Sequence, residues 1–186
     1  MSQSAAETNR FALRDLAFIG LFSVLIAVCS WITIPGPVPF TLQTFGIFCA
    51  LGMLGGKRGT CSILVYILLG IIGIPVFSGF TGGVGQLLGM TGGYIVGFLL
   101  MGLLYWLVTR LAGTSLPVMI LAMLLGLAAC YAFGTAWFVQ VYTQQKGAIT
   151  VMAALGSCVF PFLIPDGIKL ALALVLTKRL AKQFRL

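Results

Sequence analysis

Long runs of apolar residues follow one another along the chain, separated by short segments rich in glycine, proline or charge. Because a bilayer core about 30 Å thick takes roughly 20 helical residues for each crossing, these runs predict transmembrane helices. About six of them fit the chain, and we place them over residues 15–33, 40–54, 60–72, 91–111, 116–141 and 151–176. Residues 1–14 are polar and predict a loose or surface-lying cytoplasmic tail, followed by one helical domain over residues 15–186.

Proline, glycine and charge mark the ends of these helices. The proline-rich segment 35–39 ends the first one, because proline lacks a backbone donor and restricts the residue before it. The next two are short and could form one re-entrant hairpin, but its tip would carry Lys57 and Arg58 into hydrocarbon. Two separate spans are therefore favoured. The glycine-rich segment 76–90 predicts an ordered, partly buried loop.

Composition supports the bilayer as the solvent of this chain. Of its 186 residues, 60% are hydrophobic and 8% are charged, which leaves too little polar surface to face water on all sides. A net charge of +8 would suggest a nucleic-acid partner in a soluble protein. Here the basic residues flank apolar runs, so we expect membrane lipid as the surroundings and no nucleic acid.

The basic residues also predict the orientation of the helices. Lys and Arg concentrate in the cytoplasmic loops of membrane proteins, and with the N-terminus inside most of them fall there, whereas Lys146 falls outside. Those on the inner side are Arg10, Arg14, Lys57, Arg58, Arg110, Lys178, Arg179, Lys182 and Arg185. We expect both termini in the cytoplasm, with residues 34–39, 74–90 and 142–150 in outer loops.

Residue types that are missing exclude several kinds of chemistry. The chain has no histidine, so Ser-His-Asp and Cys-His nucleophiles and histidine-based metal sites are excluded. Its five cysteines are scattered through apolar runs without a CxxC pair and are interpreted as small apolar residues. No GxxxxGK[ST] motif is present for ATP hydrolysis. We expect neither an enzyme nor a metal or cofactor site.

Two ionisable residues, Asp166 and Lys169, fall inside the last apolar run. They lie three positions apart, so they share one helix face, in the outer half of that helix. Charges at such depth are costly and favour a functional role. The pair either neutralises itself as a structural ion pair or faces a solute that carries both N–H donors and a carboxylate.

Other polar side chains fall on the same outer side: Thr41, Gln43, Thr44, Gln86, Thr91 and Tyr94. Gln43 and Gln86 can each donate and accept, as a urea-like ligand group would require, or they satisfy loose backbone groups near helix ends. Aromatic residues nearby either wall an apolar pocket or anchor the chain at the membrane interface. These are Phe40, Phe77, Phe80, Trp137 and Phe160.

The first helix carries small residues, Gly20, Ser23 and Ala27, at steps of three or four. Such a stripe lets another helix approach closely. The approaching helix belongs either to this chain or to a separate membrane subunit, and we predict the second as a docking surface.

Four segments together resemble the BioY family, the biotin-specific S-components of energy-coupling factor transporters. They are residues 35–44 (PGPVPFTLQT), 68–77 (LLGIIGIPVF), 89–94 (GMTGGY) and 161–169 (PFLIPDGIK). The resemblance implies a six-helix S-component fold that captures biotin near the outer face. It also implies a transmembrane coupling subunit and cytoplasmic ATPases as partners.

The same resemblance implies roles for particular residues. Asp166 and Lys169 match the acidic and basic ligand-binding positions of the family, and Gln43 lies in the matching TLQT motif. Gln86 and Tyr131 are carried over as weaker matches. The implied mechanism is binding followed by reorientation, with the loop over residues 74–90 as a lid. Three alternatives stay open: another vitamin such as thiamin or riboflavin, a membrane enzyme that uses Asp166, and a packing subunit without a ligand.

Overall fold

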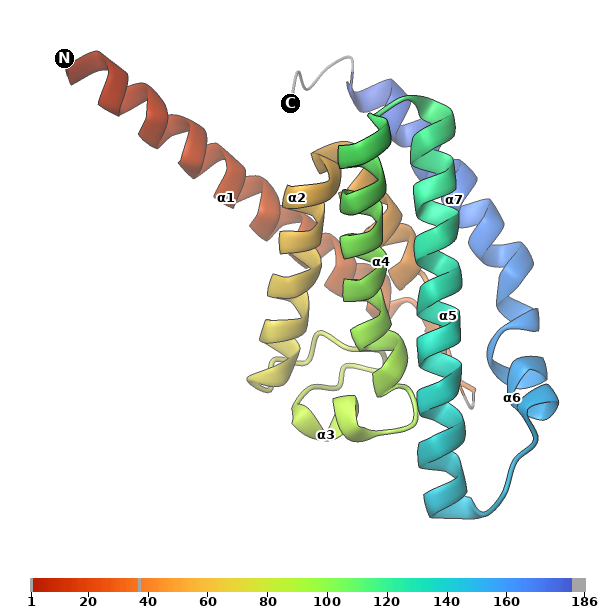
Figure 1. The fold of residues 1–186 in the computed structure, drawn as a ribbon. Helices are drawn as coiled ribbons and strands as arrows, with labels where there is room; N and C mark the ends of the chain where they lie inside the picture. The colour runs from red at the N-terminus through yellow and green to blue at the C-terminus, as the bar shows by residue number, and fades with distance from the viewer. Residues whose placement is uncertain (1, 37, 182–186) are drawn as a thin grey trace.

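The computed structural model describes residues 2–36 and 38–181. This part of the chain is almost entirely helical (Figure 1). Its elements are α1 (Ser2–Trp31), β1 (Thr33–Ile34), β2 (Phe40–Thr41), α2 (Gln43–Ile71), α3 (Val84–Leu88), α4 (Gly92–Ala112), α5 (Leu116–Lys146), α6 (Val151–Cys158) and α7 (Phe160–Ala181). Five stretches of the described residues are long and apolar enough to cross a membrane, with α6 and α7 taken as one.

One of these stretches, α2, is two spans joined by a sharp reversal. Gly55 interrupts the helix with φ 77° and ψ 178°, a conformation that favours glycine. A Cβ atom on Gly59 would lie 2.8 Å from the carbonyl oxygen of Ala50. Nine residues of straight helix would separate these positions by about 13 Å, so the chain turns back on itself. The described residues thus form six transmembrane segments, which confirms the prediction.

The helices pack as a bundle around α2 and α4. Figure 1 shows α4 between α2 and α5, and α1 and α7 each pack against α2. The most deeply buried large side chains include Ile26, Phe48, Tyr66, Met101 and Met123, which come from four of these helices. This core fixes the relative positions of α2 and α7, the two helices that carry most of the predicted site.

The beginning of α1 and the end of α7 lie at the same end of the bundle, as an even number of crossings requires (Figure 1). The reversal of α2 and the end of α4 lie at that end as well. The connection between α5 and α6 lies at the opposite end, where α3 also lies. Lys182 and Arg185, which entered the prediction of orientation, lie outside the described residues.

Some boundaries differ from those that the sequence predicts. Helix α1 begins at Ser2, so residues 2–14 continue the first helix. The last predicted helix is divided into α6 and α7 by Val159, whose φ of −126° and ψ of −57° are not helical. The two strands that flank the proline-rich segment 35–39 form a small antiparallel hairpin in which Thr33 pairs with Thr41. This hairpin positions the residues that precede α2.

The glycine-rich loop between α2 and α4 is ordered, as predicted, and it contains the short helix α3. Phe77 from this loop is 1% exposed and packs edge-on against Tyr66 of α2, with ring centroids 5.6 Å apart. The indole N–H of Trp31 donates to the carbonyl oxygen of Pro75 at 2.9 Å. The loop is therefore held to both α1 and α2.

Candidate ligand-binding site

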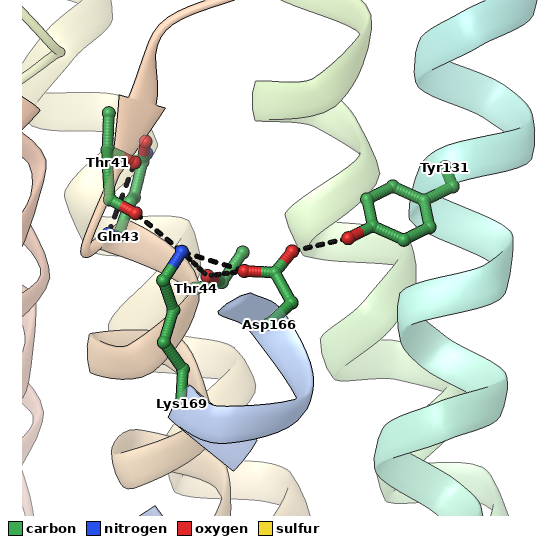
Figure 2. Close-up of polar contacts among 6 residues, drawn as sticks. All are labelled: Thr41, Gln43, Thr44, Tyr131, Asp166 and Lys169. Carbon is green, nitrogen blue, oxygen red and sulfur yellow. Dashed lines mark hydrogen bonds and ion pairs between the residues drawn. The ribbon is translucent and has the colours of Figure 1, made fainter. Parts of the chain in front are cut away.

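Asp166 and Lys169 form a buried ion pair on α7 (Figure 2). The ammonium nitrogen of Lys169 lies 2.7 Å from Oδ1 of Asp166, and the two residues are 5% and 2% exposed. Their spacing of three positions places them on one helix face, as the sequence predicts. The two charges compensate each other, which is how a bilayer-spanning helix accommodates them.

The ammonium of Lys169 is surrounded by acceptors from α7 and from the start of α2. Besides Asp166, it donates to the carbonyl oxygen of Thr41 at 2.7 Å and to Oγ1 of Thr44 at 3.2 Å. It also lies 4.3 Å from the centroid of the Phe40 ring, a cation–π contact. An ammonium has three donors, so the chain itself fills all of them.

The carboxylate of Asp166 joins three helices. Its Oδ1 accepts from Lys169 and from the hydroxyl of Thr44, which lies 2.8 Å away. Its Oδ2 accepts from the hydroxyl of Tyr131 on α5 (Figure 2). A carboxylate offers about four lone-pair sites. These three bonds therefore leave it able to accept one more.

The pair borders a cavity whose lining includes residues of α2, α4, α5 and α7 and of the glycine-rich loop. Its volume is about 70 Å³, measured as the space open to the centre of a water molecule. One water needs about 10–15 Å³ by that measure, so several fit. The lining consists of Val38, Pro39, Thr41, Gln43, Thr44, Phe77, Ser78, Thr91, Tyr94, Ile95, Phe98, Leu127, Cys130, Tyr131, Cys158, Phe162, Asp166 and Lys169. A mostly apolar wall with a few convergent polar groups is typical of small-molecule sites.

Gln43 lies in the first turn of α2 and lines the cavity. Its side-chain Nε2 donates to the hydroxyl of Tyr66 at 2.7 Å, and its backbone N–H donates to Oγ1 of Thr41 at 3.2 Å. Its side-chain oxygen accepts no hydrogen bond from the described residues. The backbone at this helix start is thus satisfied by Thr41, and the carboxamide of Gln43 keeps an acceptor toward the cavity.

The structure separates the remaining predicted site residues into two groups. Tyr94 and Tyr131 line the cavity, and the hydroxyl of Tyr94 shares a hydrogen bond of 3.0 Å with Thr135. Gln86 lies on α3 and is not among the lining residues. Of the five aromatic candidates, Phe77 lines the cavity and Phe40 contacts Lys169.

The other three aromatic candidates lie elsewhere. Phe80 stacks on Trp31 with ring centroids 5.1 Å apart, and Phe160 is exposed. Trp137 donates its indole N–H to the carbonyl oxygen of Gly89 at 3.0 Å. Their positions fit the interface-anchor interpretation better than the pocket-wall interpretation.

Sequence reasoning missed several residues of the site. Tyr66 holds the Gln43 side chain, and Phe162, Cys130 and Cys158 form part of the wall. A hydroxyl inside an apolar span needs a hydrogen-bond partner, so the sequence indicates that Tyr66 makes a buried hydrogen bond. It does not indicate that the partner is Gln43, 23 positions away. Among the described residues, no group of three or more Cys, Asp, Glu or His side chains could hold a metal ion.

A second, apolar groove lies on the other side of Tyr131, between α5 and α6. It has a volume of about 530 Å³ by the same measure, and its lining includes Ala136, Val151 and Leu155. Tyr131 lines both spaces. Its ring therefore forms part of the wall that separates the ligand cavity from this groove.

The small-residue stripe on α1 packs mainly inside this chain. Ser23 is 1% exposed, and its hydroxyl donates to the carbonyl oxygen of Ser62 on α2 at 2.9 Å. Ala27 is buried as well. These two side chains are covered by the chain's own helix and are not exposed to a partner. Gly20 is half-buried, and nothing lies within 4 Å of a Cβ built there, so its docking role stays a prediction.

A comparison with known protein families identifies the family of this chain. The model of the BioY family matches residues 1–186 of the chain. The chain belongs to the BioY family. The predicted family is thereby confirmed over the whole sequence.

Individual BioY relatives match almost end to end. A probable biotin transporter BioY of Pyrococcus horikoshii is 39% identical over 90% of this chain and 96% of its own length. The biotin transporter BioY of Thermotoga maritima is 38% identical over 91% of this chain and 97% of its own length. These relatives are named as transporters, which agrees with the prediction that the chain is not an enzyme.

A solved structure confirms the predicted fold class. The S-component for biotin from an ECF-type ABC transporter superposes with a TM-score of 0.81 and 31% sequence identity. The match covers 94% of each chain. The BioY chain described here therefore has the S-component fold, a multi-pass helical membrane architecture.

Proposed function

We propose that this chain is the biotin-binding S-component of an energy-coupling factor transporter and captures biotin at the outer face of the cell membrane. The observation that carries the proposal is the buried Asp166–Lys169 pair on the wall of a largely apolar cavity. The names of the BioY relatives and of the matching S-component support biotin over other vitamins.

The ureido ring of biotin fits the acceptors that face the cavity. A cyclic urea presents two N–H donors and one carbonyl oxygen. Asp166 keeps one lone-pair site, and the Gln43 side chain keeps a carbonyl oxygen that accepts nothing from the described residues. Both residues line the cavity. We assign the two ureido N–H groups to these acceptors.

The remaining wall suits the rest of the ligand. Phe77, Phe98 and Phe162 supply aromatic surface for the thioether ring and the aliphatic chain, since sulfur and methylene groups pack well against aromatic rings. Phe77 belongs to the glycine-rich loop, so the loop forms part of the cavity's cover. We propose that this loop opens to admit the ligand and then closes over it.

Lys169 serves mainly to hold Asp166 in this arrangement. Its three donors are filled by Asp166, Thr41 and Thr44, so a ligand carboxylate could reach it only by displacing one of them. The alternative role for Lys169, direct capture of the valerate carboxylate, therefore ranks second. Thr41 and Thr44 act with Lys169 as positioning residues for the carboxylate.

Orientation and partners complete the proposal. The bundle end that carries Lys57, Arg58 and Arg110 would face the cytoplasm, because Lys and Arg favour that side. Both ends of the chain would then be cytoplasmic, and the loop over residues 74–90 would face outward. The sequence has no ATP-binding motif, so a transmembrane coupling subunit and cytoplasmic ATPases would supply the energy for release inside.

Titration calorimetry on the purified, detergent-solubilised chain tests the proposal. Biotin should give saturable heat, desthiobiotin should bind more weakly because it lacks the thioether ring, and thiamin should give none. The Asp166→Asn variant should bind biotin about 10-fold to 150-fold more weakly, whereas Asp15→Asn, in a surface ion pair with Arg58, should keep the original affinity. Absence of saturable heat with biotin, or equal heat with thiamin, would refute the assignment.

A further inference from the structure

A groove at the basic end of the bundle, away from the ligand cavity, has the chemistry of a lipid site. It lies along the last three turns of α4 and is lined by Leu103, Trp106, Leu107 and Arg110. Its volume is about 200 Å³, measured as the space open to the centre of a water molecule. Leu103 and Leu107 are 43% and 52% exposed. The groove therefore has an apolar stem and a cationic end.

Arg110 has no anionic partner in the part of the chain that the structure describes. The whole sequence contains only three acidic residues against eleven basic ones. Asp15 pairs with Arg58 at 3.0 Å, and Asp166 pairs with Lys169. The third acid is Glu7, whose side chain lies outside the described part. Neither of the described carboxylates is therefore available to Arg110 as a counter-charge.

Trp106 adds a fixed donor to the same groove. A Cβ atom on Gly56 would lie 2.6 Å from Cα of Trp106, so the reversal of α2 packs directly against this residue. The next residue in that reversal is the exposed Lys57. The indole N–H of Trp106 makes no hydrogen bond within residues 2–36 and 38–181, and tryptophan is typical of the membrane interface.

We propose that this groove binds one anionic phospholipid, with its phosphate at Arg110 and an acyl chain along Leu107 and Leu103. The seven helical steps from Leu103 to Arg110 rise about 10 Å along the helix, the depth over which a lipid passes from its headgroup into hydrocarbon. A free phosphate would use only the cationic end, whereas a phospholipid also covers the two leucine side chains. The groove lies outside the ligand cavity, so this inference is independent of biotin binding.

Fluorescence quenching tests the site, because Trp106 is itself a reporter. Trp31→Phe with Trp137→Phe leaves Trp106 as the single tryptophan of the chain. This protein is reconstituted into phosphatidylcholine vesicles that contain brominated phosphatidylglycerol or, at equal mole fraction, brominated phosphatidylcholine. One favourable charge contributes about fivefold preference for anionic lipid. The apparent affinity obtained from quenching should therefore be about fivefold higher for brominated phosphatidylglycerol than for brominated phosphatidylcholine.

Two variants separate a specific site from general surface charge. Arg110→Gln should abolish the preference, whereas Arg179→Gln, an exposed arginine in the last turns of α7, should leave it unchanged. Soluble inorganic phosphate should not compete. If the single-tryptophan protein does not fold, the difference in quenching between the full chain and its Trp106→Phe variant reports the same contact. Equal quenching by the two lipids, or a preference that survives Arg110→Gln, overturns the proposal.

Discussion

Removing the two charges of the Asp166–Lys169 pair, singly and together, separates its structural role from its role in binding. The variants are Asp166→Asn, Lys169→Met and the double variant. Each single change leaves one charge buried without its partner, whereas the double change leaves none. The stability and the biotin affinity of the three proteins should therefore follow different orders.

The magnitude follows from the geometry of the pair. At a separation of 2.7 Å, two unit charges attract with about 6 kcal/mol at an effective dielectric constant of about 20. The cost of desolvation offsets much of this, but breaking a buried pair by removing one partner typically costs about 3–5 kcal/mol. Replacing both partners with uncharged residues is close to neutral. We expect each single variant to be destabilised by about 3–5 kcal/mol and the double variant to recover most of that loss.

Affinity should behave differently. A ligand N–H loses its charged acceptor in Asp166→Asn, and a hydrogen bond to a charged group contributes about 1.5–3 kcal/mol, which is about 10-fold to 150-fold in dissociation constant. The double variant lacks the same carboxylate, so it should bind biotin as poorly as Asp166→Asn although it is more stable. Unfolding in detergent measures stability, and titration calorimetry measures affinity.

One result would refute this reasoning. If the double variant recovered both the stability and the biotin affinity of the original chain, the pair would be a structural feature without contact to the ligand. The surface pair of Asp15 and Arg58 provides the matched control. Its side chains are 30% and 29% exposed, and exposed pairs contribute about 0–1 kcal/mol. Asp15→Asn with Arg58→Gln should therefore change neither quantity appreciably.

Two further predictions concern the walls of the cavity. Tyr131→Phe removes a donor to Asp166 and should weaken biotin binding about tenfold; Tyr131→Ala should weaken it further, because it also opens the cavity to the apolar groove. Equal affinities of these two variants in titration calorimetry would contradict a wall role for the ring. Gly70→Ala places a Cβ atom against the Phe77 ring and should destabilise the chain by about 1–3 kcal/mol. Gly156→Ala, with nothing within 4 Å, is the control, and equal unfolding temperatures would contradict the packing argument.

The number and order of the transmembrane segments could be predicted because hydrophobic length is a strong constraint in a bilayer. Glycine and basic residues around Gly55 also located the reversal of α2, although both arms are short. The break at Val159 was missed because the apolar run continues through it. Pro161, which is tolerated in the first turn of a new helix, is the local sign of that break. Residues 2–14 are mostly polar, so their hydrophobicity does not predict that α1 extends through them.

The position of the candidate site could be predicted from the sequence, but the contacts among its residues could not. An acid and a base inside an apolar run are conspicuous, and their spacing places them on one face. Whether they meet each other or a ligand depends on the approach of α2, more than 120 positions away in the chain. The sequence gives no measure of that distance. For the same reason, the burial of Ser23 against α2 could not be distinguished from docking to a separate subunit.

The approach of α2 to α7 also determines which member of the pair is open to a ligand. Thr41 and Thr44 occupy the donors of Lys169 that Asp166 leaves free, whereas Asp166 keeps a lone-pair site on the cavity wall. A ligand with N–H groups therefore adds a hydrogen bond without breaking one. A ligand carboxylate at this position would have to displace a bond that the chain already makes, and would bring a second negative charge close to Asp166. The preformed network thus favours a neutral donor, such as a cyclic urea, over an anion beside α7, and the anionic end of a ligand is directed elsewhere in the cavity.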